Sequence, residues 1–393
     1  PLGTSTQNYA FYGPDIIYWI ATLGAVACEG VLAALLSIVA YKLIIQNPKG
    51  WTKYVVGFGI LIPFWVVFPP LLLQMLDVQN KLMKFCVGAI CPTLAIFHTS
   101  EAMFGCAPPH TTRSMADYAL YWGSPIYLIF DSKKQTYVKA NTTDLVAHLT
   151  RFLLCLFTVG AIQSILAQSH FEPYPVPADE PWYSASRFLN RHQLSNNIGV
   201  TFLMQSYMSM YTVGLEATAI LLTGRKVQQV MNNPVLESTT PSEFWTQRWN
   251  TLVQGVLKRG VYIPMRKMGC HKLVSVAGTF LASGVLHEWL LTIVYLVVDS
   301  EKGTDGRCSD CFVPMHGGST AFMLYMSLII AVEKTVAHYE IFAQTKHHRL
   351  PKPILTMLLL MLGIPVVHWF MDPYTKSDFF LEGGIGLPMI KPL

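Results

Sequence analysis

Charged residues are scarce in this 393-residue sequence, because Asp, Glu, Lys and Arg together make up only 13% of the chain. Soluble domains carry about 25% charged residues, so the composition excludes an ordinary soluble globular protein. We also expect no nucleic-acid partner. Hydrophobic residues make up 52% of the chain, and the mean hydropathy is +0.38. The sequence therefore predicts an integral membrane protein.

Internal repeats and low-complexity tracts are also lacking. A transporter would explain polar groups in apolar segments, but it predicts inverted repeats and paired broken helices, and the sequence shows neither. No signal peptide can be read at the start. Because the chain opens on Pro1 instead of Met, we expect this end to be processed or incomplete.

Eight apolar stretches are each long enough to cross a bilayer as a helix. They lie at residues 17–41, 54–76, 82–104, 146–168, 196–224, 273–298, 317–343 and 353–372. We therefore expect an all-α fold, a polytopic transmembrane helix bundle of about eight or more spans. The whole chain, residues 1–393, reads as a single domain.

The connections between these stretches alternate in charge. Those at 42–53, 105–145, 225–272 and 344–352 are basic, whereas those at 77–81, 169–195 and 299–316 are neutral or acidic. Basic loops stay in the cytosol in most membrane proteins. The pattern therefore predicts cytosolic basic loops and places both chain ends on the opposite side.

Two of the eight cysteines stand apart, because Cys308 and Cys311 lie in an acidic loop that we place outside the cytosol. Oxidising conditions there would permit a disulfide. The interpretation that we prefer is a local disulfide or two free thiols. A zinc site that also uses His316 is the weaker alternative, because no second Cys-x-x-Cys pair is present.

Two ionisable residues, His287 and Glu288, lie near the middle of the stretch 273–298. If the helix starts near Leu273, His287 lies about 21 Å along it, close to the bilayer midplane. A polar group at this depth must face a protein-lined or watery cavity, so it marks a candidate functional site. Ser283 lies four residues earlier on the same helix face, whereas Glu288 points about 100° away and has a different partner.

The segment before this stretch carries three signals of a helix start. Thr240 is a predicted N-cap, Pro241 occupies the first helical position and Glu243 completes a capping box. Apolar residues then recur at helical spacing up to Leu257. We expect an amphipathic helix at the cytosolic interface with its Trp residues at headgroup level. An interfacial anchor without chemistry is the alternative that periodicity alone leaves open.

A neutral imidazole in an apolar pocket can act as a general base. The sequence contains no Ser–His–Asp order and no nucleophile elbow, so it does not indicate a covalent serine intermediate. Four other polar residues fall near the midplane, and for each a packing or helix–helix role is the more probable one. These are Glu29, Glu101, Glu333 and His368.

Two motifs resemble a known family. Phe244-Trp245-Thr246-Gln247-Arg248-Trp249-Asn250 and Ser283-Gly284-Val285-Leu286-His287-Glu288-Trp289 resemble, in this order, motifs of the wax-synthase-like branch of the membrane-bound O-acyltransferase superfamily. The stretch His98–Gly105 and the pair Asn233-Pro234 are also similar. The resemblance covers residues 82–300, and the rest of the chain is similar only in hydropathy.

The resemblance implies transfer of an acyl group from acyl-CoA to a lipophilic alcohol, a long-chain fatty alcohol or a sterol. His287 matches the catalytic histidine, which acts as general base without a covalent acyl-enzyme, and Asn250 matches the second polar residue. Acyl-CoA is then a co-substrate, with no cofactor and no metal. The alcohol and membrane lipids are the further partners, and the endoplasmic reticulum is the expected membrane. Oligomeric state stays open.

Substrate binding is assigned on the same grounds to residues around the two motifs, namely Trp245, Arg248, Trp249, Ser283, Glu288, Lys258 and Arg259. A wider basic cluster could bind the phosphates of CoA, or could merely anchor the loop on anionic lipid. This cluster comprises Lys258, Arg259, Arg266, Lys267, His271 and Lys272.

One departure concerns the first motif, where Thr246-Gln247 replaces the Gly-Arg of many wax-synthase-like members. The missing positive charge puts the detailed contacts to CoA in doubt. A second function from another class stays open as well. The chain could be a non-catalytic membrane subunit that keeps the acyltransferase fold as a scaffold in a larger complex.

Overall fold

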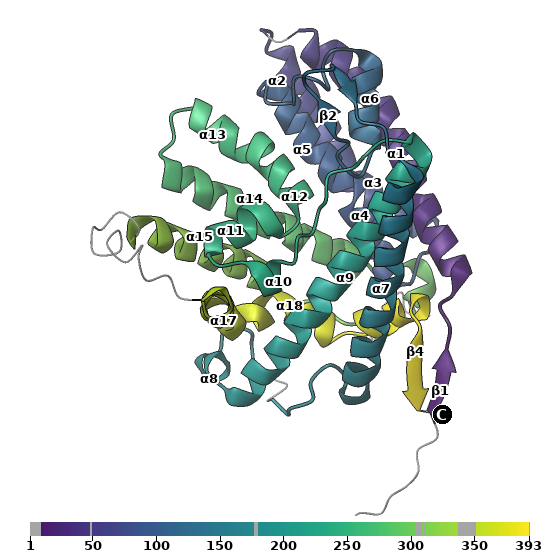
Figure 1. Ribbon diagram of the computed structural model, residues 1–393, viewed down its shortest axis with the longest axis vertical. Coiled ribbons are helices and arrows are strands. Elements are labelled where there is room, and N and C mark those ends of the chain that lie inside the picture. The colour runs from purple at the N-terminus through teal and green to yellow at the C-terminus, as the bar shows by residue number, and fades with distance from the viewer. Residues whose placement is uncertain are drawn as a thin grey trace, which may run out of the picture.

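The computed structural model describes residues 9–47, 49–176, 180–303, 308–309, 311–336 and 351–392 (Figure 1). Helices dominate these residues, as the all-α prediction requires. Strands occur there only as two short antiparallel pairs. Strand β1 (Tyr9–Tyr12) pairs with β4 (Met389–Pro392), and β2 (Phe130–Asp131) pairs with β3 (Thr136–Tyr137).

The first half of the chain forms long helices joined by short connections. Its elements are α1 (Ile16–Ala40), η1 (Tyr41–Ile45), α2 (Thr52–Val56), η2 (Gly57–Leu61), α3 (Ile62–Met75), α4 (Lys81–Ala89), α5 (Cys91–Met103), α6 (Met115–Gly123), α7 (Thr142–Leu166), η3 (Ala167–Ser169), α8 (Ala185–Phe188) and α9 (Arg191–Thr223). Helix α3 continues through Pro69 and Pro70 without a break.

The second half contains many short helical segments before the next long helices. These are α10 (Pro234–Glu237), α11 (Pro241–Glu243), η4 (Phe244–Arg248), α12 (Thr251–Leu257), η5 (Lys258–Tyr262), α13 (Ile263–Lys267), α14 (Lys272–Val294), η6 (Asp299–Glu301), α15 (Gly318–Val336), α17 (Lys352–Gly363), η8 (Ile364–Val366), α18 (Val367–Thr375), α19 (Phe379–Gly383) and η9 (Gly384–Gly386).

Among the described residues, seven helical stretches are long and apolar enough to cross a membrane. They correspond to the expected spans except 196–224, although residues 337–343 of the expected span 317–343 lie outside the described part. The remaining span is the 33-residue helix α9. It is less apolar because polar side chains such as Gln193, Asn197 and Glu216 are buried along it.

Helix α9 nevertheless returns over the length of α7. Its C-terminal end meets the start of α7, where Ala140 N donates to Gly224 O at 2.9 Å and Lys226 lies 3.0 Å from Asp144. At the N-terminal end of α9, Asn196 Nδ2 donates to the carbonyl oxygen of Tyr174 in the connection that follows α7. The two helices therefore run antiparallel, and a membrane crossing by α9 stays a prediction. The chain is an integral membrane protein.

Connections of the same charge type contact one another. The basic connections 105–145 and 225–272 meet at a bridge between Leu128 and Val227. The loops at 77–81 and 299–316 meet where Ser300 N donates to Asp77 at 3.1 Å. Pairing of β1 with β4 puts the two ends of the described chain together. These contacts agree with the predicted alternation, although residues 304–307, 310 and 344–350 lie outside the described part.

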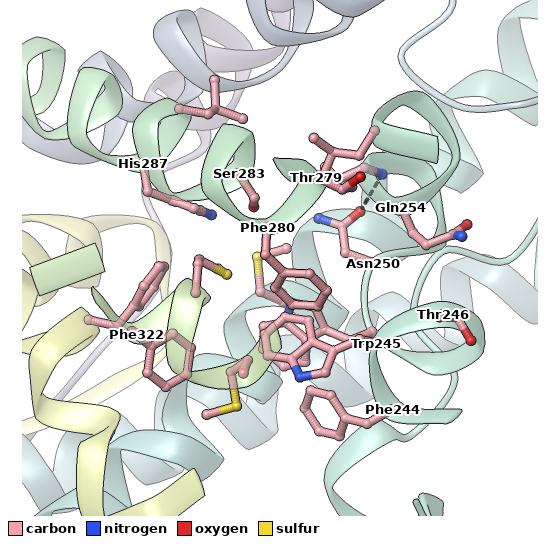
Figure 2. A pocket seen from close by; sticks show the side chains of 18 of the residues that line it. Phe244, Trp245, Thr246, Asn250, Gln254, Thr279, Phe280, Ser283, His287 and Phe322 are labelled. Atoms are coloured by element: carbon pink, nitrogen blue, oxygen red, sulfur yellow. Dashed lines mark hydrogen bonds between the residues drawn. The ribbon is translucent and has the colours of Figure 1, made fainter. Parts of the chain in front are cut away.

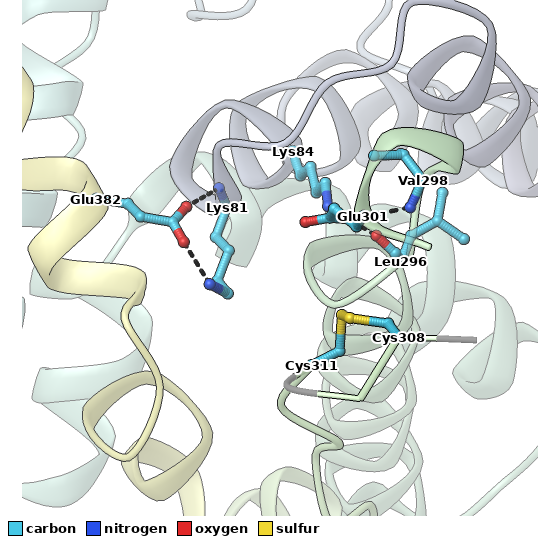
Figure 3. Close-up of a disulfide and its surroundings, with 8 residues drawn as sticks. All are labelled: Lys81, Lys84, Leu296, Val298, Glu301, Cys308, Cys311 and Glu382. Carbon is cyan, nitrogen blue, oxygen red and sulfur yellow. Dashed lines mark hydrogen bonds and ion pairs between the residues drawn. A yellow bond between two sulfur atoms is a disulfide. The ribbon is translucent and has the colours of Figure 1, made fainter. Parts of the chain in front are cut away.

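A disulfide, a hydrogen bond and an ion pair stabilise the connection after α14 (Figure 3). Cys308 and Cys311 form the local disulfide that the sequence favoured, and the weaker zinc interpretation is therefore wrong. Lys84, 2% exposed, donates to the carbonyl oxygen of Leu296 at 2.7 Å and lies 3.1 Å from Glu301. A buried ammonium is stable only with such partners. These contacts hold the end of α14, the helix that carries His287.

Candidate active site

The start of the predicted amphipathic helix is confirmed. Thr240 Oγ1 accepts a hydrogen bond from Glu243 N at 3.1 Å, and Pro241 is the first residue of α11. The carboxylate of Glu243 accepts from Thr239 N, one residue before the position of a standard capping box. Local sequence signals therefore located this helix start correctly.

The continuous helix predicted beyond this point is wrong. Segment η4 ends at Arg248, the next residue Trp249 is extended, and Asn250 has φ 41°, in the left-handed region. Asn tolerates this conformation better than most residues, because its short polar side chain bonds locally. Its Oδ1 accepts from Val253 N at 3.1 Å and so caps α12. The chain therefore turns at Asn250 and starts a new helix.

The Trp residues of this segment pack against other aromatic rings of the protein. Trp245 packs edge-on against Phe280 and Phe322, with ring centroids 5.8 and 6.4 Å apart. Trp249 packs against Phe244, which lies beside Trp245. The turn at Asn250 directs these rings towards α14 and α15, so they line a cavity inside the bundle.

His287 lies on α14, about 22 Å from the start of the helix at 1.5 Å per residue. Its ring packs edge-on against Phe370 of α18 at 4.7 Å. Its Nδ1 is buried and has no hydrogen-bond partner among the described residues. No carboxylate therefore orients this imidazole within the described part of the chain, which distinguishes it from the histidine of a Ser–His–Asp triad.

His287 and Asn250 line the same cavity, which has a volume of about 1170 Å³ (Figure 2). Figure 2 shows the imidazole and the amide nitrogen of Asn250 both directed towards the space beside Ser283. The cavity walls are largely apolar and come from α4, α9, α12, α14, α15 and α18. A reactive group bound there would lie between one nitrogen base and one amide donor.

Among the residues assigned to substrate binding, Trp245, Trp249, Ser283 and Lys258 line the cavity. Lys258 is exposed and lies at the rim, together with the exposed His271 and Lys272. The structure adds the exposed Lys334 of α15 to the lining residues, where it pairs with Glu333 at 3.0 Å. Nothing in the sequence pattern links Lys334 to the two motifs, because it lies 47 residues after His287. Exposed basic side chains thus form part of the edge of a largely apolar cavity.

Arg248 does not line the cavity. Its guanidinium donates to Glu243 at 2.7 Å, to Glu237 at 2.8 Å and to the carbonyl oxygen of Asn232 at 3.2 Å. Asn232 N in turn donates to Arg248 O. Arg248 therefore has a structural role, because its hydrogen bonds stabilise the turn that contains Trp249 and Asn250.

Two further assigned residues also face other partners. Glu288 accepts from Thr320 N at 3.0 Å and lies 3.2 Å from His316 Nδ1, so it faces α15 as the 100° rotation per residue predicts. Arg259 pairs with Glu101 of α5 at 2.9 Å. Neither lines the cavity, and the contacts of both residues lie within the protein.

The wider basic cluster divides in the same way. Arg266 donates to the carbonyl oxygen of Cys270, and Lys267 donates to those of Phe104 and Gly105. Only Lys258, His271 and Lys272 of the six predicted residues line the cavity. Sequence reasoning missed Gln254 and Thr279, which line it as well. Spacing could have found them, because each lies four residues from a motif residue, Asn250 or Ser283.

Comparison with known proteins agrees with this geometry. Residues 112–299 match the model of the membrane-bound O-acyltransferase family. This part of the chain, just under half of its length, is similar to that family. The match contains both Asn250 and His287, and it leaves the stretch His98–Gly105 outside. The resemblance inferred from the two motifs is thereby confirmed.

The similar proteins are named as long-chain-alcohol O-fatty-acyltransferases, in agreement with the resemblance to the wax-synthase-like branch. Probable long-chain-alcohol O-fatty-acyltransferase 2 of Arabidopsis thaliana is 29% identical over 153 residues, 34% of this chain and 43% of that protein. Acyltransferase 3 of the same series is 35% identical over 83 residues (19% and 24%), and acyltransferase 9 is 24% identical over 185 residues (45% and 47%). These alignments span less than half the length of each relative.

Proposed function

We propose that this protein transfers an acyl group from acyl-CoA to the hydroxyl of a lipophilic alcohol within the membrane. One observation carries the proposal: His287 and Asn250 line a single, largely apolar cavity with a basic rim. The names of the similar plant proteins favour a long-chain fatty alcohol as acceptor, with a sterol as the alternative. The endoplasmic reticulum is the membrane that we propose on the family resemblance.

In the proposed reaction, His287 takes the proton of the alcohol while the alcohol oxygen attacks the thioester carbon. An ester forms, the carbon–sulfur bond breaks, and the CoA thiolate takes the proton from the imidazolium. An imidazole without a carboxylate partner is suited to this task, because it stays neutral until it receives the proton. No acyl-enzyme forms.

Asn250 supplies the complementary electrostatic part. Its Oδ1 is held by Val253 N, so the Nδ2 protons are the groups that face the cavity (Figure 2). An amide held in this way can donate to the oxyanion that develops on the thioester, and it needs no reorganisation to do so. The backbone conformation of Asn250 thus orients its side chain for catalysis.

The basic rim suits the polyanionic end of acyl-CoA. Lys258, His271 and Lys272 lie on one wall, and Lys334 lies on α15. The phosphates stay among these exposed groups while the acyl chain enters the apolar interior, and the acceptor reaches the same space from the lipid phase. Both apolar substrates then meet without crossing water.

Purified protein incubated with labelled acyl-CoA and panels of fatty alcohols, sterols and diacylglycerol tests the proposal. We expect labelled ester with wild type and with His110→Ala, a histidine outside the cavity. We expect none with His287→Ala. Ester formation that survives His287→Ala would remove the histidine from its role, and no ester with any acceptor would favour the scaffold alternative.

A further inference from the structure

A buried ion pair lies on the side of α12 and η5 that faces away from the cavity. Arg259 Nε donates to Glu101 Oε1 of α5 at 2.9 Å, and the Glu101 side chain is 0% exposed. Tyr121 of α6 donates to the second carboxylate oxygen at 2.7 Å and accepts from Arg259 at 3.1 Å. His98 Nδ1 lies 3.2 Å from the same oxygen. Each group of this pair is thus well partnered.

The helices meet closely at this point because the contact residues are small. Ser100 Oγ donates to the carbonyl oxygen of Gly260 at 2.6 Å. A Cβ atom on Gly260 would lie 3.2 Å from the carbonyl oxygen of Phe97, and one on Gly255 would lie 3.3 Å from the guanidinium of Arg259. Larger side chains would push η5 away from α5. We call this contact, formed by Ser100, Glu101, Tyr121, Gly255, Arg259 and Gly260, the Arg259 contact.

The same helical run carries Asn250 at its beginning. Arg259 follows Asn250 by nine residues, which at about 100° per residue places the two on opposite sides of the run. The cavity-lining residues Val253, Gln254 and Leu257 are on the Asn250 side. The run is therefore fixed on one side by the Arg259 contact and presents its reactive amide on the other.

We propose that the Arg259 contact is a positioning element that sets Asn250 for the acyl transfer. This inference rests on the proposed function. It also gives a role to the stretch His98–Gly105, which contains Ser100 and Glu101. This stretch lies outside the family match and takes no part in the proposed reaction. Displacing a reacting group by 1 Å can cost about 100-fold in rate, so an ion pair distant from the chemistry can limit kcat.

The test is a double-mutant cycle between Arg259→Lys and Asn250→Gly. Lys keeps the charge but loses the planar fork that contacts Glu101 and Tyr121 together. We expect Arg259→Lys to lower kcat at least tenfold and to leave the KM for acyl-CoA unchanged. Added to Asn250→Gly, it should cause almost no further loss, because the group that it positions is already gone.

Arg187→Lys is the matched control. Arg187 is 1% exposed and pairs with Asp372 at 2.7 Å, and neither of these two residues lines the cavity. Its effect on kcat should be small, and it should add to that of Asn250→Gly. If Arg259→Lys does not fold, Tyr121→Phe keeps the ion pair and should give a smaller, equally non-additive loss.

Additive losses for Arg259→Lys or Tyr121→Phe with Asn250→Gly would overturn the positioning role and leave the proposed function intact. A kcat for Arg259→Lys no lower than that of Arg187→Lys would do the same. Full activity of Asn250→Gly alone would instead contradict the proposed role of Asn250, and the positioning role would fall with it.

Discussion

Replacing Asn250 by Gly separates its proposed catalytic role from its structural one. Gly adopts the left-handed conformation of φ 41° without strain. As an N-cap, Gly costs only a few tenths of a kcal/mol relative to Asn. Asn250→Ala differs, because the left-handed backbone costs Ala about 1–2 kcal/mol and loss of the cap costs about 1 kcal/mol more.

Both substitutions delete the same amide donor. Removing one donor to a developing oxyanion lowers kcat about 100- to 1,000-fold. We therefore expect Asn250→Gly and Asn250→Ala to be equally inactive, whereas Asn250→Ala alone unfolds at a clearly lower temperature. The assay combines initial rates of ester formation in detergent with thermal unfolding of the same samples.

This reasoning would be refuted if the activities of the two variants changed in parallel with their stabilities. If Asn250→Gly keeps near wild-type turnover while Asn250→Ala loses it, the side chain serves only to cap α12. Gly199→Ala is a control for helix damage, because a Cβ there would make an ordinary contact with Leu166 at 3.5 Å. It should change neither activity nor unfolding temperature by much.

Three further predictions concern packing, substrate charge and pH. Gly284→Val should destabilise the protein by about 1–3 kcal/mol, measured by thermal unfolding, because a Cβ there would lie 2.7 Å from the backbone of α15. Lys272→Gln should raise the KM for acyl-CoA severalfold with kcat unchanged, and added salt should diminish the difference from wild type; an unchanged KM would remove Lys272 from donor binding. Hydrogen bonds from Asn233 and from Arg248 lower the pKa of Glu237 in the folded protein. The carboxylate therefore stabilises the fold fully above the pKa that Glu has in the unfolded chain, about 4.3. This stabilisation is lost as the pH falls through the lower pKa of the folded protein. Arg248→Met should make the unfolding temperature less sensitive to pH in this acidic range, and an unchanged sensitivity would contradict the assignment.

Hydropathy and loop charge predicted most of the helices of the bundle. Both signals depend on the local composition of the sequence, which a single stretch of chain already contains. The span at α9 shows the limit of hydropathy. Its polar residues would be tolerated in a membrane only where other helices cover them, and Asn197, for example, donates to the carbonyl oxygen of Ile364, 167 residues later. Composition cannot show which helix face is covered.

Sequence reasoning identified cavity-lining residues within the two motifs. It misassigned residues whose role depends on partners that are distant in the sequence. The apolar spacing from Phe244 to Leu257 resembles one helix, yet Asn250 breaks it with a left-handed turn that its own side chain stabilises. Arg259 resembles a cytosolic phosphate ligand in the sequence. Its partner Glu101 lies 158 residues earlier in the chain, and no local pattern connects the two.

The central claim is direct attack on acyl-CoA with His287 as base, and a single-turnover experiment tests it most directly. Labelled acyl-CoA is mixed with purified protein, with and without a long-chain alcohol, and protein and lipid are separated after quenching. We predict that wild type forms labelled ester only when alcohol is present, that His287→Ala forms none, and that the protein itself carries no label. Label bound covalently to the protein, or ester made by His287→Ala at the wild-type rate, would contradict the account.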